Sequence, residues 1–170
     1  QQRLARMLGP QLYGDVTNIA RVSLKEVLQN SFDAVRSAMR TLGVSRGKID
    51  IRTTGDSITM IDNGVGMAPE FLGTKFLEIA GTGKDGTEAS GGFGIAKMLF
   101  LYGNNSLRVV TMRDGVVAEL NTSGQELFSA LGEPGNAPKI KVRSPTEQDN
   151  ASFPDGHGTL IRMEFPTEVK

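Results

Sequence analysis

Apolar side chains recur at helical spacing through residues 18–42, which predicts one long amphipathic helix. These positions are Ile19, Val27, Leu28, Ala34, Val35 and Met39. Gly43 follows directly, and glycine is typical of the residue that ends a helix. We predict shorter helices over residues 3–12, 69–79 and 95–102, the second of them beginning at Pro69.

Alternating polar and apolar residues predict strands elsewhere in the chain. Residues 48–53 and 57–61 alternate on either side of Gly55-Asp56, and residues 107–113 and 116–120 flank Asp114-Gly115, a strong hairpin signal. Residues 139–143 and 159–165 are two further predicted strands, separated by a polar loop over residues 144–156. The sum is a single α+β domain over residues 1–170, a two-layer sandwich of helices on a mostly antiparallel sheet.

Composition narrows the functional classes. Nineteen basic residues balance nineteen acidic ones, so no broad attraction to nucleic acid or membranes is indicated, although the whole protein could still handle nucleic acid. The sequence has no cysteine and one histidine, which excludes disulfides, thiolate metal sites and histidine-rich metal sites. No apolar run approaches the roughly 18 residues that span a bilayer, and no signal-like segment opens the sequence. We therefore expect a cytoplasmic protein.

Three polar residues share one face of the long predicted helix. Glu26, Asn30 and Asp33 stand at i, i+4 and i+7, within roughly 40° of one another around the axis. The simpler interpretation is the polar edge of an amphipathic helix. If the residues are buried, a magnesium ion would explain them, because the amide oxygen of Asn30 suits Mg²⁺ and Glu26 could activate a water molecule.

A carboxylate followed by two glycines ends the second predicted strand. Asp62 is followed by Gly64, Gly66 and Met67, an arrangement that suits a simple turn as well as a binding loop. In the functional interpretation the glycines let the backbone pass close to a flat ligand. A buried Asp62 would then accept a hydrogen bond from an exocyclic amine, which favours adenine over guanine by about 1–3 kcal/mol.

A second glycine cluster, residues 91–94, leads into the predicted helix over residues 95–102. Backbone N–H groups at a helix N-terminus form an anion site, although this cluster matches neither a P-loop nor a Rossmann loop. Residues 80–94 are rich in glycine, threonine and serine and suit a lid over a nucleotide, in which Lys84 is either a phosphate contact or a solvated lysine. Thr159 is a candidate support for Asp62, and His157 is expected to be a surface loop residue.

The order and spacing of these motifs resemble the GHKL ATPase superfamily. The motifs are Glu26-x-x-x-Asn30-x-x-Asp33-Ala34, Asp62-x-Gly64-x-Gly66-Met67, Gly91-Gly92-Phe93-Gly94 and Gly158-Thr159. The superfamily contains type II topoisomerase ATPase subunits, the large heat-shock chaperones, sensor histidine kinases and MutL proteins. The resemblance covers residues 12–165, leaves residues 1–11 as an N-terminal extension, and is strongest to the heat-shock chaperones, although Ala96 replaces a chaperone glycine.

The resemblance implies the Bergerat fold, with helices on one face of a mixed sheet and ATP under a lid formed by residues 80–94. It implies Glu26 as the catalytic base and Asn30 as the Mg²⁺ ligand, with Asp62 reading adenine beside Thr159. The full set of expected ligand-binding residues is Asn30, Asp33, Asp62, Gly64, Gly66, Met67, Lys84, Gly92, Phe93, Gly94, Ile95 and Thr159.

Three functions follow as hypotheses. The first is an ATPase whose cycle of ATP binding and hydrolysis to ADP drives a conformational change in a larger protein or dimer. The second is histidine-kinase-type phosphotransfer, against which the single His157 stands outside any phosphoacceptor helix pattern. The third is a nucleotide-sensing module without hydrolysis, because the second domain that usually supplies a basic residue to the γ-phosphate in this superfamily is not among these residues.

Overall fold

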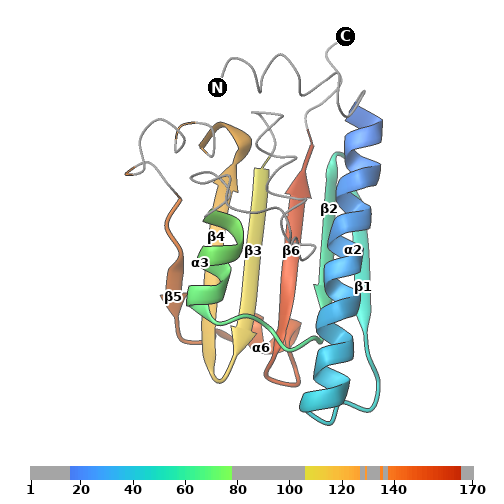
Figure 1. Ribbon diagram of the computed structural model, residues 1–170, viewed down its shortest axis with the longest axis vertical. Coiled ribbons are helices and arrows are strands. Elements are labelled where there is room, and N and C mark those ends of the chain that lie inside the picture. Colours follow the sequence, from blue (N-terminus) through green and yellow to red (C-terminus); the bar gives the residue numbers. More distant parts are fainter. Residues whose placement is uncertain (1–15, 78–105, 127–128, 130–134, 136–137, 166–170) are drawn as a thin grey trace.

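The computed structural model describes residues 16–77, 106–126, 129, 135 and 138–165 (Figure 1). In chain order the elements are α2 (Val16–Thr41), β1 (Ile49–Thr54), β2 (Ser57–Asp62), α3 (Pro69–Leu77), β3 (Ser106–Arg113), β4 (Val116–Ser123), β5 (Lys141–Arg143), α6 (Glu147–Ser152) and β6 (Gly158–Glu164). The fold class is therefore α+β, as the alternation of helical and strand periodicity predicted.

The six described strands form one sheet in the order β1-β2-β6-β3-β4-β5. Every pairing among them is antiparallel, so the described sheet is not mixed. The last strand in sequence, β6, lies between β2 and β3 and joins the two hairpins that the sequence predicted (Figure 1). In this register Asp62 of β2 is opposite Thr159 of β6, and Thr159 is opposite Thr111 of β3.

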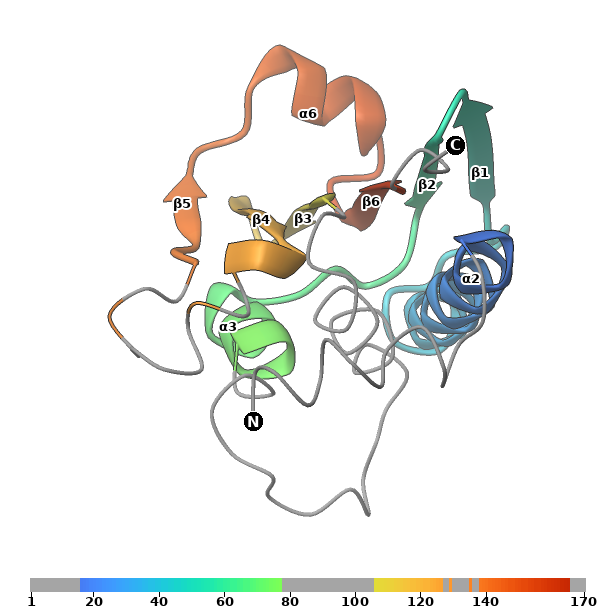
Figure 2. The same ribbon diagram turned by 90° about the horizontal axis from the view of Figure 1, so that it is seen from above.

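The helices cover both faces of the sheet, not one face as expected. Figure 2 shows α2 and α3 below the sheet and α6 above it. The larger core lies on the α2 and α3 face and consists of Val27, Met60, Leu72, Leu107, Val109, Ala118, Leu120, Ile161 and Met163. Phe153, which follows α6, packs on the opposite face against Val110, Met112 and Val117.

Helix α6 was predicted as part of a polar loop, and that prediction was wrong. Its sequence, Glu147–Ser152, carries no apolar stripe, so periodicity gives no helical signal. A capping box forms it: Thr146 accepts from the backbone of Asp149, and the Asp149 carboxylate accepts from the backbone of Thr146.

The predicted turns agree with the backbone. The long helix ends before Gly43, whose φ of 68° is in the left-handed region. Asp114 and Gly115 both have positive φ, 52° and 76°, as the two-residue hairpin between β3 and β4 requires. Among the described helices, none has the length and apolar character needed to cross a membrane.

Candidate functional site

Asp62 is a buried carboxylate at the end of β2. It is 5% exposed, and its Oδ1 accepts a hydrogen bond of 2.8 Å from the backbone N–H of Gly64. Burial is the largest effect on this group and raises the pKa of Asp62 to about 6. Hydrogen bonds from the backbone of Gly64, the side chain of Ser31 and the backbone of Thr159 lower the pKa in part. The carboxylate is thus held between α2, the loop after β2 and β6.

A row of polar side chains continues from Asp62 across the sheet. Thr159 and Thr111 are its neighbours on β6 and β3, and both are buried. Their hydroxyl oxygens lie 3.0 Å apart, and the Thr111 hydroxyl accepts a 2.8 Å hydrogen bond from the backbone N–H of Met67. Thr111 therefore fixes the end of the loop that begins at Asp62. No sequence pattern singled out Thr111, because a threonine in a strand is ordinary.

The two glycines of this loop have packing reasons for being glycine. A Cβ on Gly64 would meet Ala34 of α2, and a Cβ on Gly66 would meet the carbonyl oxygen of Met112. Gly66 also has a φ of 71°, which side chains disfavour. The N–H of Val65, between them, donates to the carbonyl of Ala34 over 3.2 Å. The close approach seen among the described residues is therefore to α2 and β3.

The polar stripe of α2 lies beside its buried face. Val27 and Ser31 are buried toward the sheet, whereas Glu26 and Asn30 are half-buried. Asp33 is exposed and accepts a 3.2 Å hydrogen bond from the Gln29 amide. The burial on which the magnesium interpretation depends is therefore not seen for Asp33.

Asn30 nevertheless lies close to the Asp62 loop. It precedes Ser31, whose hydroxyl acts on Asp62, and it stands one helical turn before Ala34, which contacts Gly64. Glu26 stands one turn further from the loop on the same flank. Asp62 and Thr159 thus lie beside the middle of α2, where Asn30 precedes Ser31 and Glu26 stands one turn earlier.

Two residues that sequence reasoning did not assign to the site hold the loop in place. Nδ1 of His157 lies 2.6 Å from the carbonyl oxygen of Gly64, so the ring donates across from the segment before β6. Asn63 accepts from the backbone N–H of Lys48 and donates to the carbonyl of Arg46. These contacts could not be predicted from local sequence, because they join residues far apart in the chain. His157 and Gly64 are 93 residues apart, and Asn63 is 15 and 17 residues from its two partners.

Several predicted features lie outside the described residues. These are the lid over residues 80–94, the helices over residues 3–12 and 95–102, and the predicted ligands Lys84, Gly92, Phe93, Gly94 and Ile95. Within the described residues, no three His, Asp or Glu side chains converge to hold a metal ion. The predicted magnesium site has a single protein ligand, Asn30, so it would not form such a cluster.

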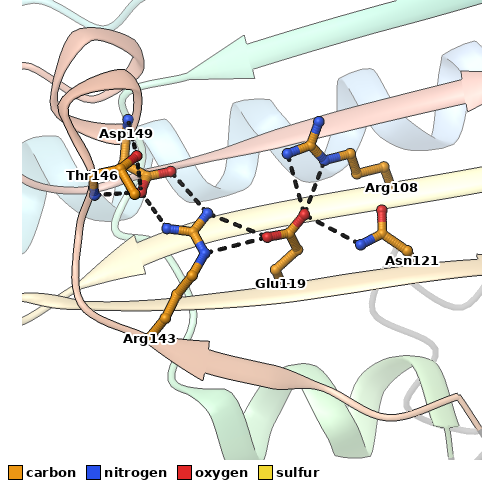
Figure 3. Close-up of polar contacts among 6 residues, drawn as sticks. All are labelled: Arg108, Glu119, Asn121, Arg143, Thr146 and Asp149. Atoms are coloured by element: carbon orange, nitrogen blue, oxygen red, sulfur yellow. Dashed lines mark hydrogen bonds and ion pairs between the residues drawn. The ribbon is translucent and has the colours of Figure 1, made fainter.

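A second polar cluster lies on the α6 side of the sheet (Figure 3). Arg143 of β5 bonds both Asp149 of α6 and Glu119 of β4, and Glu119 also pairs with Arg108 of β3 at 3.1 Å. The Arg143 hydrogen bond is the main reason that the pKa of Asp149 is lowered to about 2, and bonds from Thr146 add to it. The carboxylate oxygens of Glu119 and Asp149 all accept bonds within the cluster, which is the arrangement of a structural clamp.

Comparison with known proteins adds no assignment: no protein-family model matches the chain, and a search of curated proteins finds no match either.

Proposed function

We propose that this chain is a GHKL-type ATPase with a Bergerat fold that binds ATP with Mg²⁺ and hydrolyses it. The proposal rests on one observation: Asp62, at the start of the glycine loop, is a buried carboxylate with a raised pKa. Removing a carboxylate from water costs stability even where hydrogen bonds offset part of the cost, and such costs are concentrated at functional sites. A ligand amine that donates to Asp62 would recover part of this cost.

Adenine is the ligand group that this end of the sheet suits best. Its exocyclic amine donates, whereas guanine presents a carbonyl at the same position, which Asp62 would repel. Thr159 and Thr111 place hydroxyl groups beside Asp62. The half-buried Met67 offers an apolar contact to the face of the base. The proposed role of Asp62 is to select the base and that of Thr159 is to support it.

The flank of α2 supplies the proposed metal ligand and base. Asn30 offers a neutral oxygen to Mg²⁺, which when bound would neutralise charge on the phosphates. Glu26, one turn away and half-buried, would accept a proton from the attacking water. Lys84 and the backbone of Gly92, Phe93, Gly94 and Ile95 are proposed phosphate contacts, and residues 80–94 are the proposed lid. Asp33 is proposed only as an outer polar neighbour, because it is exposed.

In this proposal the nucleotide cycle drives a conformational change in a larger protein or dimer. The lid would order on ATP and be released after hydrolysis to ADP. Other domains of the same chain or a second subunit are the proposed partners, and they would supply any missing basic contact to the γ-phosphate.

The test is calorimetric titration with Mg²⁺-ATP, Mg²⁺-ADP and Mg²⁺-GTP, together with a phosphate-release assay. We expect ATP and ADP to bind and GTP to bind at least about tenfold more weakly. Asp62→Asn should weaken ATP binding at least about tenfold, because it removes the charged acceptor. Glu26→Ala should retain ATP binding and stop turnover.

Matched controls are Asp155→Asn and Glu147→Ala, which remove exposed acids near α6 on the opposite face. Both should bind and turn over ATP like the unmodified chain. No heat with any nucleotide would reject the proposal, and equal turnover in Glu26→Ala would remove that residue from its role. Binding of ATP without turnover would favour the nucleotide-sensing alternative. Transfer of labelled phosphate from ATP to an added protein would favour phosphotransfer.

A further inference from the structure

Strand β1 forms the outer edge of the sheet. It pairs with β2 and with no other described strand, and it lies outermost in Figure 2 beside α2. Residues 51–54 are all exposed, and the residue Ile51 is 45% exposed. An exposed edge with a large apolar residue at its centre is a template for pairing with another chain.

The register of β1 shows which of its backbone groups point away from β2. The N–H of Asn63 donates to the carbonyl of Lys48 over 3.2 Å, so the backbone of Lys48 points toward β2. Backbone groups alternate along an antiparallel strand, and those of Ile49, Ile51 and Thr53 therefore point outward. The outward backbone groups, which pair with no described strand, thus belong to the residues whose side chains face α2.

In a symmetric pairing of two β1 strands, the charged residues of one copy would face residues of opposite charge in the other. Asp50 and Arg52 flank Ile51, and they form an ion pair of 3.0 Å on the exposed α6 face. If two copies pair antiparallel about Ile51, Asp50 stands opposite Arg52 of the partner subunit on both sides of the axis. Pairs of opposite charge across strands stabilise the pairing, and these would be the closely spaced, non-hydrogen-bonded pairs.

The two neighbouring symmetric registers oppose like charges. Centring the pairing on Asp50 would place two aspartates opposite each other, and centring it on Arg52 would do the same with two arginines. Pairing about Ile51 matches the outward backbone groups, as pairing about Ile49 or Thr53 would, and it is the register that brings Asp50 opposite Arg52 of the partner subunit.

Helix α2 adds apolar surface at the same edge. Met39, which helical spacing places with the core residues, is 46% exposed, and Phe32, two turns earlier, is equally exposed. Gly47, just before β1, lies against Val35 and Met39, so this side of α2 borders the β1 edge. The side chain of Ile51 is on the same face, because Ile51 is opposite the buried Met60.

We propose that this chain forms a two-fold symmetric dimer through antiparallel pairing of β1 with β1 of a second copy, centred on Ile51. The two six-stranded sheets become continuous. The paired Ile51 residues lie at the axis on the α2 face, with Phe32 and Met39 of each copy flanking them. On the other face, two Asp50–Arg52 pairs cross the axis. Asp50 and Arg52 line the same cavity as Asp62, so the dimer is tested without nucleotide.

Charge reversal at β1, followed by sedimentation without nucleotide, tests the dimer. The unmodified chain should sediment as a species of twice the chain mass at high micromolar concentration, with weaker association at high salt. Asp50→Arg places four arginines across the axis and Arg52→Asp places four aspartates there, so each variant alone should dimerise at least tenfold more weakly. Mixed together, the two variants should form a heterodimer, because each supplies the charge that the other lacks.

The matched control is the Arg162–Glu164 pair of β6, which has the same i, i+2 spacing on an inner strand. Arg162→Asp and Glu164→Arg should leave dimerisation unchanged, and circular dichroism should show all variants folded. The dimer proposal would be overturned if the unmodified chain sedimented with the mass of a monomer at every concentration. It would also be overturned if the single variants associated like the unmodified chain, or if their mixture stayed monomeric. None of these outcomes depends on whether ATP binds.

Discussion

Asp62 is a buried carboxylate whose charged form is only partly stabilised by its hydrogen bonds. Its pKa is raised from 3.8 to about 6, because removal from water outweighs the hydrogen bonds that favour the charged form. The folded state therefore binds a proton more tightly than the unfolded state does. At the scale of the single residue, Asp62 lowers the stability of the fold at neutral pH, which is the cost expected at a binding site.

The consequence is a defined pH dependence for Asp62→Asn. Because the folded pKa is raised, the unmodified chain loses stability as pH rises from about 4 to about 6, by up to about 3 kcal/mol. The amide cannot ionise, so the variant should gain about that much relative to the unmodified chain between pH 4 and pH 8. Urea unfolding of both proteins at the two pH values measures the difference. Parallel changes with pH would contradict this role of Asp62.

At the scale of the element, α6 depends on ionised Asp149. This carboxylate closes the capping box with Thr146 and bonds Arg143 of β5, which in turn bonds Glu119 of β4. A six-residue helix without an apolar stripe has little stability of its own. The cluster in Figure 3 therefore holds α6, and Phe153 after it, on its face of the sheet.

Asp149→Asn should keep a capping oxygen but lose the charge. The pKa of Asp149 is lowered to about 2, so its contribution is present above about pH 4 and is lost as pH falls toward 2. We expect the variant to lose about 2 kcal/mol of unfolding free energy at pH 7 and almost none at pH 2. Denaturant titrations at both pH values measure this, with the exposed Asp155→Asn as the control. An equal loss at both pH values would show that the charge of Asp149 is unimportant.

At the scale of the whole molecule, β6 holds the sheet together. It joins the β1-β2 hairpin to the strands β3, β4 and β5, although it comes last in sequence. Its buried residue Ile161 lies opposite both Met60 and Val109, within the larger core. Neither half of the sheet can pair with the other until this strand is present.

A chain that ends at residue 157 should therefore show no cooperative unfolding transition. In the full chain, Ile161→Ala should lower the unfolding free energy by about 2–5 kcal/mol, because it empties the centre of the core. Arg162→Ala, its exposed neighbour, should change it by less than about 1 kcal/mol. Thermal and urea unfolding measure both. Independent melting of the β1-β2 half would contradict the central role of β6.

Local patterns in the sequence determined the elements and the turns. The spacing along α2, the alternation in both hairpins and the residues Gly43, Asp114 and Gly115 each act within a few residues of chain, so their physics is local. Asp62 could be singled out as a candidate because a carboxylate ended an apolar strand before two glycines.

Only the tertiary structure decided how these pieces meet. It placed β6 between the hairpins, α6 on the far face and His157 against Gly64. It also made Thr111 part of the polar row and left Asp33 and Met39 exposed. Such contacts join residues tens of positions apart, and no local propensity encodes them. They form because burying the apolar faces of α2, α3 and the sheet fixes where each polar group must find its partner.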